Sequence, residues 1–291
     1  MTFEISSSLL IQMIVNGILL GGFYGLAAVG LNLIWGVMNI VNIAHGEFLM
    51  LGAFSSFWVF AYLGINPFLS LVFSLPLGFA IGIFVFKFFI RRLIDAPQLM
   101  SLLATFGISI FILKAVELTW TSDYRGIPVY YPTFDLGGVV APGGRFGAFI
   151  AAAAFSIFLY VLLMKTHTGR AIRAVIQDRE AAILQGIDAT YISFITFGLG
   201  IALTTAAGSL ITASYAAIFP EIGSIFLLKT FAIVVLGGLR SPFSALLGGV
   251  ILGLSESMAQ LFITASLSEA IAFLLLVLIL LFKPSGIFGL R

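Results

Sequence analysis

The chain has 291 residues, of which 61% are hydrophobic and only 9% are charged, whereas soluble domains carry about 25% charged residues. This composition excludes a soluble globular protein and predicts an integral membrane protein. The net charge of +2 is too small to indicate nucleic-acid binding, and the absence of cysteine excludes disulfides and thiolate chemistry.

The apolar residues come in long blocks rather than alternating ten-residue segments, which predicts helices and not an outer-membrane barrel. The blocks cover residues 9–30, 36–63, 67–86, 99–118, 147–164, 192–217, 226–238, 244–263 and 268–282. The first block has no basic segment before it and is longer than a signal-peptide core, so we expect it to be retained. We predict an all-α, polytopic membrane helix bundle of about nine spans, with eight to ten possible, in a single transmembrane domain over residues 1–291.

One stretch places strong polarity inside the apolar part of the chain. Its polar residues are Asn39, Asn42, His45 and Glu47. If the stretch is helical, the first three share a face, and Gly46 offers a point where that helix can bend or break. A carboxylate near the bilayer centre costs roughly 2.5 to 3.5 kcal/mol, so Glu47 should face protein or a wet cavity. The pattern predicts an interrupted helix at a translocation pathway or its gate; the alternative is that these residues only hold neighbouring helices together.

Positive charge orients the blocks. Basic residues gather at four sites: Lys87, Arg91 and Arg92; Lys165, Arg170, Arg173 and Arg179; Arg240; and Lys283 with Arg291. If all four sites are cytoplasmic, each interval between them holds two crossings, and the C terminus is cytoplasmic. Residues 31–63 then give nine spans and an external N terminus if they cross once, or ten spans and an internal N terminus if they cross twice.

Two other regions are functional candidates. Residues 121–146 are rich in Pro and Gly and form the longest external connection, either a passive loop or a docking surface for an external partner. Lys229 and Glu256 are ionisable residues within apolar blocks, which makes them possible functional sites. They could pair, although they lie at different levels along adjacent spans.

The longest cytoplasmic connection, residues 166–191, contains a predicted short helix. Asp178 is a suitable N-cap, Ala181, Ala182 and Leu184 form a small apolar face, and Gly186 ends the helix. Arg179 and Glu180 provide charged flanks. A helix of this kind can insert into a groove of another protein.

This loop resembles the EAA coupling motif of ABC-importer permeases, in which a cytoplasmic helix contacts the ATP-hydrolysing subunit. The chain from about Met13 to Phe288 resembles the branched-chain amino-acid permease family, specifically its LivH-type subunit. The stretches that carry this resemblance are Gly30–Gly36, Asn42–Phe48, Val235–Leu239 and Ser241-Pro242. Arg240 departs from the small residue that the family commonly has there.

The resemblance implies the transmembrane permease subunit of an ATP-driven importer for leucine, isoleucine or valine, multi-pass in the bacterial inner membrane. The implied partners are a second permease, two cytoplasmic ATPase subunits, an external substrate-binding protein and the lipid bilayer. ATPase coupling would fall to Asp178, Arg179, Glu180, Ala181, Ala182 and Gly186. ATP and Mg would be used by the partners, since no Gly-x-x-x-x-Gly-Lys-Ser/Thr motif occurs.

We therefore expect no enzyme activity, cofactor, catalytic residue or metal in this chain, whose only histidines, His45 and His167, lie in separate regions. One alternative keeps the architecture and changes the cargo to urea, short amides or other amino acids. Another is an ion-coupled secondary transporter with Glu47 and Glu256 as proton sites, which would work without ATP.

Overall fold

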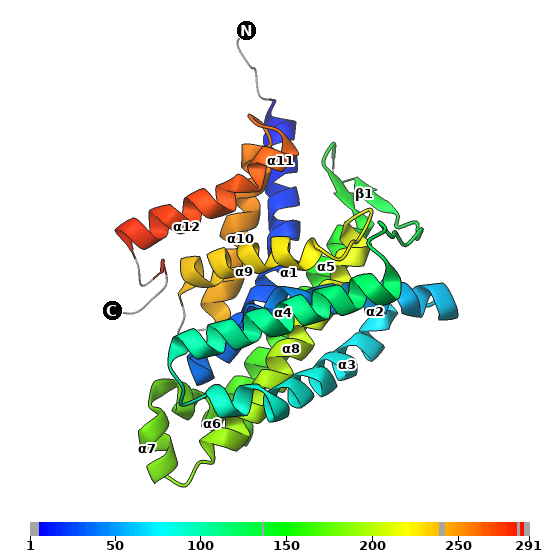
Figure 1. The fold of residues 1–291 in the computed structure, drawn as a ribbon. Helices are drawn as coiled ribbons and strands as arrows, with labels where there is room; N and C mark the ends of the chain where they lie inside the picture. The colour runs from blue at the N-terminus through cyan, green and yellow to red at the C-terminus, as the bar shows by residue number, and fades with distance from the viewer. Residues whose placement is uncertain (1–5, 136, 239–241, 284–285, 288–291) are drawn as a thin grey trace.

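The computed structural model describes residues 6–135, 137–238, 242–283 and 286–287. Its described part contains nine apolar helices, one for each predicted block, which confirms the all-α bundle (Figure 1). Those long and apolar enough to cross a membrane are α1 (Ser7–Met38), α2 (His45–Leu63), α3 (Pro67–Phe88), α4 (Gln98–Trp120), α5 (Gly143–Lys165) and α8 (Ala189–Ser214). The shorter ones are α9 (Ile222–Gly237), α10 (Pro242–Ala259) and α12 (Ala270–Phe282).

Short elements join these helices. They are the 3-10 helix η1 (Ile90–Leu93), the helices α6 (His167–Gln177), α7 (Arg179–Leu184) and α11 (Ala265–Ser268), and the antiparallel strands β1 (Thr133–Asp135) and β2 (Val140–Pro142). The hairpin was not predicted from the Pro- and Gly-rich segment that contains it. Its turn includes Gly137 and Gly138, whose φ angles of 69° and 92° favour glycine.

Contacts between connections define two ends of the bundle. At one end the hairpin contacts the start of α1. The 121–132 segment contacts both the α8–α9 connection and the α2–α3 connection. The contacts are Gln12 with Val140, Arg125 with Ile218, and Tyr131 with Asn66. Burial raises the pKa of Tyr131, so its phenol keeps its proton and donates to Asn66 Oδ1 at 3.2 Å.

At the opposite end, Arg179 of α7 pairs with Asp95, which lies between η1 and α4. Two of the basic clusters therefore share one end of the molecule, as the charge pattern predicted, and α6 and α7 lie far from the start of α1 in Figure 1. The start of α1 and the hairpin lie at the other end. Six of the described helices are long and apolar enough to cross a membrane, and the nine or ten crossings and the side on which α1 starts stay predictions.

The polar stretch corrects the sequence prediction in three respects. Residues 36–38 complete α1 and residues 39–44 form no helix, so the span predicted over block 36–63 starts at His45. Asn39, Asn42 and His45 therefore share no helical face. The chain breaks before Gly46 rather than at it, because Asn39 adopts the left-handed conformation with φ of 53° and asparagine tolerates that region.

Gly46 instead allows a close helix contact. It lies in the first turn of α2, where an added Cβ would be 2.1 Å from the carbonyl oxygen of Gly223 in α9. Glycine is therefore required for the approach of two backbones.

Helix α1 is packed at the centre of the bundle against α10 through small residues. Gly17, Gly21 and Gly25 recur at four-residue spacing on α1 and face Gly249 and Gly253 of α10. An added Cβ at Gly21 would lie 2.5 Å from Cα of Val250, which is backbone and cannot rotate away. Close approach of this kind is a main source of helix association in lipid.

We predict that Gly21→Leu destabilises the protein by about 3 kcal/mol, because overpacking at this contact must separate the two helices. Gly107→Leu on α4 is the matched control, since nothing lies within 4 Å of the Cβ it would add. Thermal stability in detergent, followed by size-exclusion chromatography, measures both. Equal melting temperatures for the two variants would contradict this packing.

Candidate functional site

The break between α1 and α2 is held closed by α4. Thr105 Oγ1 accepts from the backbone N–H of Ile43 at 3.1 Å and shares its proton between the carbonyl oxygens of Val41 and Leu102, each 3.1 Å away. The N–H of Ile43 and the carbonyl of Val41 are two backbone groups that the break removes from helical hydrogen bonding. A single hydroxyl thus satisfies both, which matters because lipid offers unpaired backbone groups no partner.

Glu47 lies beside this break and is also held by α4. Its side chain accepts a hydrogen bond from Ser109 at 3.1 Å through Oε1, and the residue is 3% exposed. Oε2 has no hydrogen-bond partner among the described residues. It lies 2.8 Å from the position of a Cβ added to Gly223. The carboxylate thus faces protein, as predicted, at the contact of α2 with α9.

The other polar residues of the stretch differ in their surroundings. His45 Nε2 faces two acceptors, the carbonyl oxygen of Ala27 at 3.0 Å and Thr204 Oγ1 at 3.2 Å. We assign the ring proton to Nε2 because Thr204 uses its own proton on Gly200 at 2.8 Å. Asn42 is 1% exposed, and neither atom of its amide has a partner among the described residues.

Asn39 does not join the buried group. It is exposed and accepts a hydrogen bond from Trp35 Nε1 at 3.3 Å. The structure therefore brings Asn42, His45, Gly46 and Glu47 together and leaves Asn39 at the edge. Sequence reasoning missed Thr105 and Ser109, although Ser101, Thr105 and Ser109 recur every four residues and are the polar residues of the buried face of α4.

The predicted coupling helix is present as α7. Asp178 Oδ1 caps it by accepting from the N–H of Ala181 at 2.9 Å, and Gly186 follows it with φ of 82°. Glu180 and Leu184 are exposed, whereas Ala182 is buried against the rest of the chain. The predicted apolar face is therefore divided: Ala182 anchors α7, and Ala181 and Leu184 face outward.

Helix α6 precedes α7 and was not predicted. Thr166 caps it by accepting from the N–H of Gly169 at 3.0 Å, and Ile172 and Val175 form its buried face. Between α6 and α7 lies a hollow of about 380 Å³, lined by Ala174, Gln177, Asp178, Ala181, Ala182, Gln185 and Ile187. This end of the bundle therefore offers both the helix α7, with exposed side chains, and a depression beside it.

Arg179 connects α7 to α4. Its Nη1 lies 2.7 Å from Asp95 Oδ1, and Asp95 precedes α4 by three residues. The side chains are 34% and 83% exposed, so the pair contributes at most about 1 kcal/mol to stability. The pair places the start of α7 beside the connection that leads into α4.

Lys229 and Glu256 form a buried ion pair, with Nζ and Oε1 2.8 Å apart. The long side chains bridge the offset between the two backbones, which sequence reasoning counted against the pair. Lys229 also donates to the Tyr24 hydroxyl at 3.2 Å, and that hydroxyl lies 2.9 Å from the hydroxyl of Tyr215. Glu269 lies 3.5 Å from the ammonium on another side. The cluster joins α1, α9 and α10 with the ends of α8 and α12, which indicates a structural role.

We predict that Lys229→Met destabilises the protein by about 3 to 5 kcal/mol, because it leaves the buried Glu256 carboxylate without its cation. The double variant Lys229→Met/Glu256→Leu should recover most of this loss. Lys114→Met, which breaks an ion pair whose lysine is 65% exposed, is the control and should cost at most about 1 kcal/mol. Melting temperatures in detergent measure the stability of all three variants. A double variant no more stable than Lys229→Met would contradict the view that the unpaired Glu256 carboxylate causes the loss.

Two stretches that carry the family resemblance meet in space. Asn32 Nδ2 donates to the carbonyl oxygen of Gly238 at 2.9 Å. Arg240 and the turn around it lie outside the described residues. Within the described residues, no group of three or more His, Asp or Glu could hold a metal ion.

Comparison with known proteins shows which family the chain matches. A family model described as branched-chain amino acid transport system, permease component, matches residues 13–280. The chain is 32% identical over 293 residues to the high-affinity branched-chain amino acid transport system permease protein BraD of Pseudomonas aeruginosa, covering 96% of this chain and 95% of BraD. It is 32% identical over 300 residues to the corresponding protein LivH of Escherichia coli, with the same coverage.

A second kind of permease in such systems is also similar. The chain is 27% identical over 297 residues to LivM of Salmonella typhimurium, covering 91% of this chain and 67% of LivM. No solved structure matches the chain significantly.

Proposed function

The chain belongs to the permease-component family of branched-chain amino acid transport systems, and on this premise we propose that it carries leucine, isoleucine or valine across the bacterial inner membrane. It is a multi-pass membrane protein, an amino-acid transport permease of the ABC type and not an enzyme. The observation that carries the mechanism is the geometry of α7, a capped helix with exposed Glu180 and Leu184 at the end of the bundle that bears the basic clusters.

The family implies a partner permease, an ATPase and an external binding protein. We propose the specific composition of one second permease of the LivM kind, two cytoplasmic ATPase subunits that use ATP and Mg, and one external binding protein that selects the cargo. The similarity to LivM supports a related second permease. Urea, short amides and other amino acids are the competing cargoes.

The coupling step begins at α7. We assign the ATPase contact to Asp178, Arg179, Glu180, Ala181 and Gly186, with Ala182 as the anchor beneath it. A displacement of α7 would be passed to Asp95 through Arg179, because their charged atoms are 2.7 Å apart. Asp95 lies in the short connection to α4, so the start of α4 would move with it.

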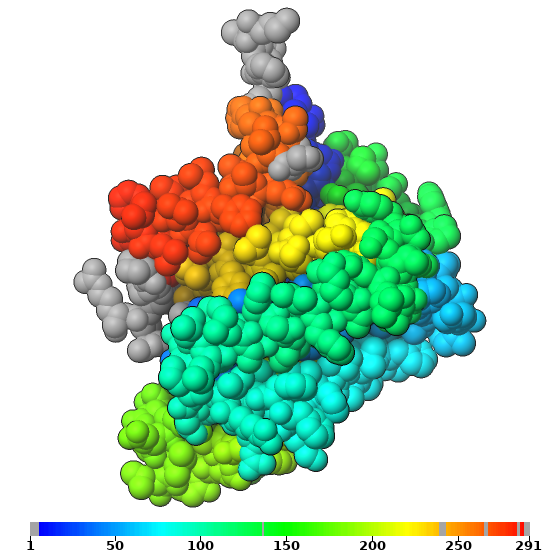
Figure 2. Space-filling view, in the orientation of Figure 1, coloured from blue at the N-terminus to red at the C-terminus, as the bar shows by residue number. Residues whose placement is uncertain are grey.

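Helix α4 is suited to move as a unit. It is the least buried of the long apolar helices, and it lies along the surface of the molecule in Figure 2. Its contacts include Val116, which is buried, and Trp120, which stacks on Phe54 of α2. Two of its small hydroxyl side chains, Thr105 and Ser109, bind the break and Glu47. Movement of α4 would therefore release the hydrogen bonds that hold the break closed.

Buried polar groups at the break favour its opening. Among the described residues, the buried amide of Asn42 and Glu47 Oε2 have no hydrogen-bond partner, and a buried polar group left unpaired costs about 1 to 3 kcal/mol. Opening would let these groups meet water or the polar ends of an amino acid, which lowers the free energy of the open state. We assign the gate to Asn42, His45, Gly46 and Glu47, with Asn39 at its rim.

We predict that Glu180→Lys abolishes ATP-driven leucine uptake into proteoliposomes containing the full importer with its binding protein, because it reverses the charge at the ATPase contact. The control Lys165→Glu changes the charge of the same end of the bundle by an equal amount outside α7 and should retain uptake. Isoleucine and valine should compete with leucine, whereas urea and short amides should not. Full uptake by Glu180→Lys, or uptake driven by an ion gradient without ATP, would contradict the proposal.

We predict that Thr105→Val lowers uptake about tenfold while ATP hydrolysis continues, because the backbone groups of Val41 and Ile43 lose their shared partner. Thr119→Val is the matched control on the same helix, since that hydroxyl bonds only to carbonyls of α4 itself, Ala115 and Val116. Its uptake should stay within about twofold of the unmodified protein. Equal uptake by the two variants would show that α4 does not govern the break.

A further inference from the structure

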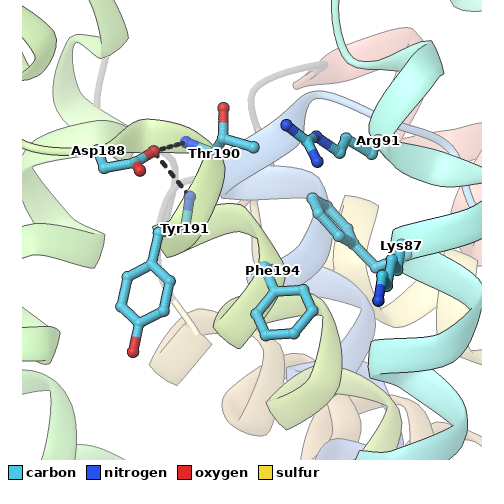
Figure 3. A pocket seen from close by; sticks show the side chains of 7 residues that line it. Lys87, Arg91, Asp188, Thr190, Tyr191 and Phe194 are labelled. Carbon is cyan, nitrogen blue, oxygen red and sulfur yellow. Dashed lines mark hydrogen bonds between the residues drawn. The ribbon is translucent and has the colours of Figure 1, made fainter.

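A groove lies between the end of α3 with η1 and the start of α8 (Figure 3). Its volume is about 340 Å³. Lys87 and Arg91 come from α3 and η1, and Asp188, Thr190 and Tyr191 come from the start of α8. The groove is therefore at the end of the bundle that carries α7, between the last turn of one membrane-span candidate, α3, and the first turn of another, α8.

The two cations have no carboxylate partner. No ion pair within 4 Å joins Lys87 or Arg91 to an acidic residue in the described ranges. Asp188, the one carboxylate of the lining, is engaged at the start of α8, where its Oδ1 accepts from the N–H groups of Thr190 and Tyr191 at 2.9 Å each. In Figure 3, Asp188 lies across the groove from both cations. The groove thus has an excess of positive charge.

The aromatic part of the lining is apolar and rigid. The rings of Phe86 and Phe194 pack edge to face with centroids 5.8 Å apart, and Tyr191 stacks on Phe194 at 6.5 Å. Phe86 is 1% exposed, whereas Tyr191 is 57% exposed. The groove therefore combines unpaired cations with an aromatic wall, as expected at a membrane interface.

An exposed apolar stripe leads along α3 to this groove. Its members recur every three to four residues: Leu69, Phe73, Leu77, Ala80, Phe84 and Phe88. Such a stripe on a membrane helix faces acyl chains. Lys87 follows directly in the last turn of α3, and its Nζ lies 5.8 Å from the ring centroid of Phe88.

We propose that this groove binds the headgroup phosphate of an anionic phospholipid of the cytoplasmic leaflet. Lys87 and Arg91 neutralise the phosphate, the Thr190 hydroxyl is available to donate to it, and an acyl chain follows the exposed stripe of α3. Basic pockets between membrane helices on this side suit such headgroups. A soluble anion would use the cations but not the stripe, and the lipid would join the end of α3 to the start of α8 next to the coupling loop.

The test is lipid retention by the complete importer, purified in mild detergent and measured by native mass spectrometry during titration with phosphatidylglycerol or phosphatidylethanolamine. The site variant is Lys87→Gln/Arg91→Gln. The matched control is Lys165→Gln/Arg173→Gln, which removes two exposed basic residues from the same end of the bundle outside the groove. We expect the site variant to bind phosphatidylglycerol roughly 10- to 30-fold more weakly than the unmodified importer, and the control to bind it unchanged.

Several results would overturn the proposal. One is equal retention by the site and control variants, and another is no preference for phosphatidylglycerol over phosphatidylethanolamine. Displacement of the lipid by excess glycerol phosphate would identify a soluble-anion site instead. Retention by the isolated chain that is lost when the ATPase subunits bind would identify the groove as a partner surface. None of these measurements requires leucine uptake, so the lipid proposal can be tested even if the proposed cargo is wrong.

Discussion

The hydrogen bonds that Thr105 makes to Val41 and Ile43 are the interaction on which the rest of the account depends. A chain interrupted within a membrane bundle exposes backbone groups that lipid cannot satisfy. Here a neighbouring helix supplies the missing partner through one side chain. The break therefore stays closed only while α4 keeps its position. Helix α4 is the least buried of the six long apolar helices, and the Asp95–Arg179 ion pair links its start to α7.

The two buried polar clusters are built differently. Lys229 is surrounded by Glu256, Tyr24 and Glu269, and its removal would leave a buried charge, so this cluster holds five helices in one arrangement. Among the described residues, Glu47 and Glu256 each leave Oε2 unpaired, but Glu256 faces a cation, whereas the amide of Asn42 at the break has no partner. A well-paired group favours rigidity, and a poorly paired group loses little when it moves. The bundle thus combines a fixed part and a movable part.

Much of this arrangement could be predicted from the sequence. Long apolar blocks predict membrane helices because a helix spans the bilayer with about 20 residues and pairs all its backbone groups internally. The ends of α7 are predicted by local chemistry, because Asp178 caps its start and Gly186 follows its end. The left-handed conformation of Asn39 and the partners of Thr105 depend on which helices become neighbours, which one sequence does not reveal. The different levels of Lys229 and Glu256 along adjacent spans argued against an ion pair between them. Sequence position gives the level of each backbone along its span, but not how far a long side chain can reach.

The central claim is that α4 must separate from the break during transport. The chain contains no cysteine, so a disulfide between introduced Thr105→Cys and Ile43→Cys would be its only one, at a place where the native side chain and backbone lie 3.1 Å apart. Uptake of leucine by the reconstituted importer should fall to background when this pair is oxidised and return on reduction to the level of Thr105→Cys alone, which lacks the native hydroxyl. Undiminished uptake by fully cross-linked protein would contradict the account.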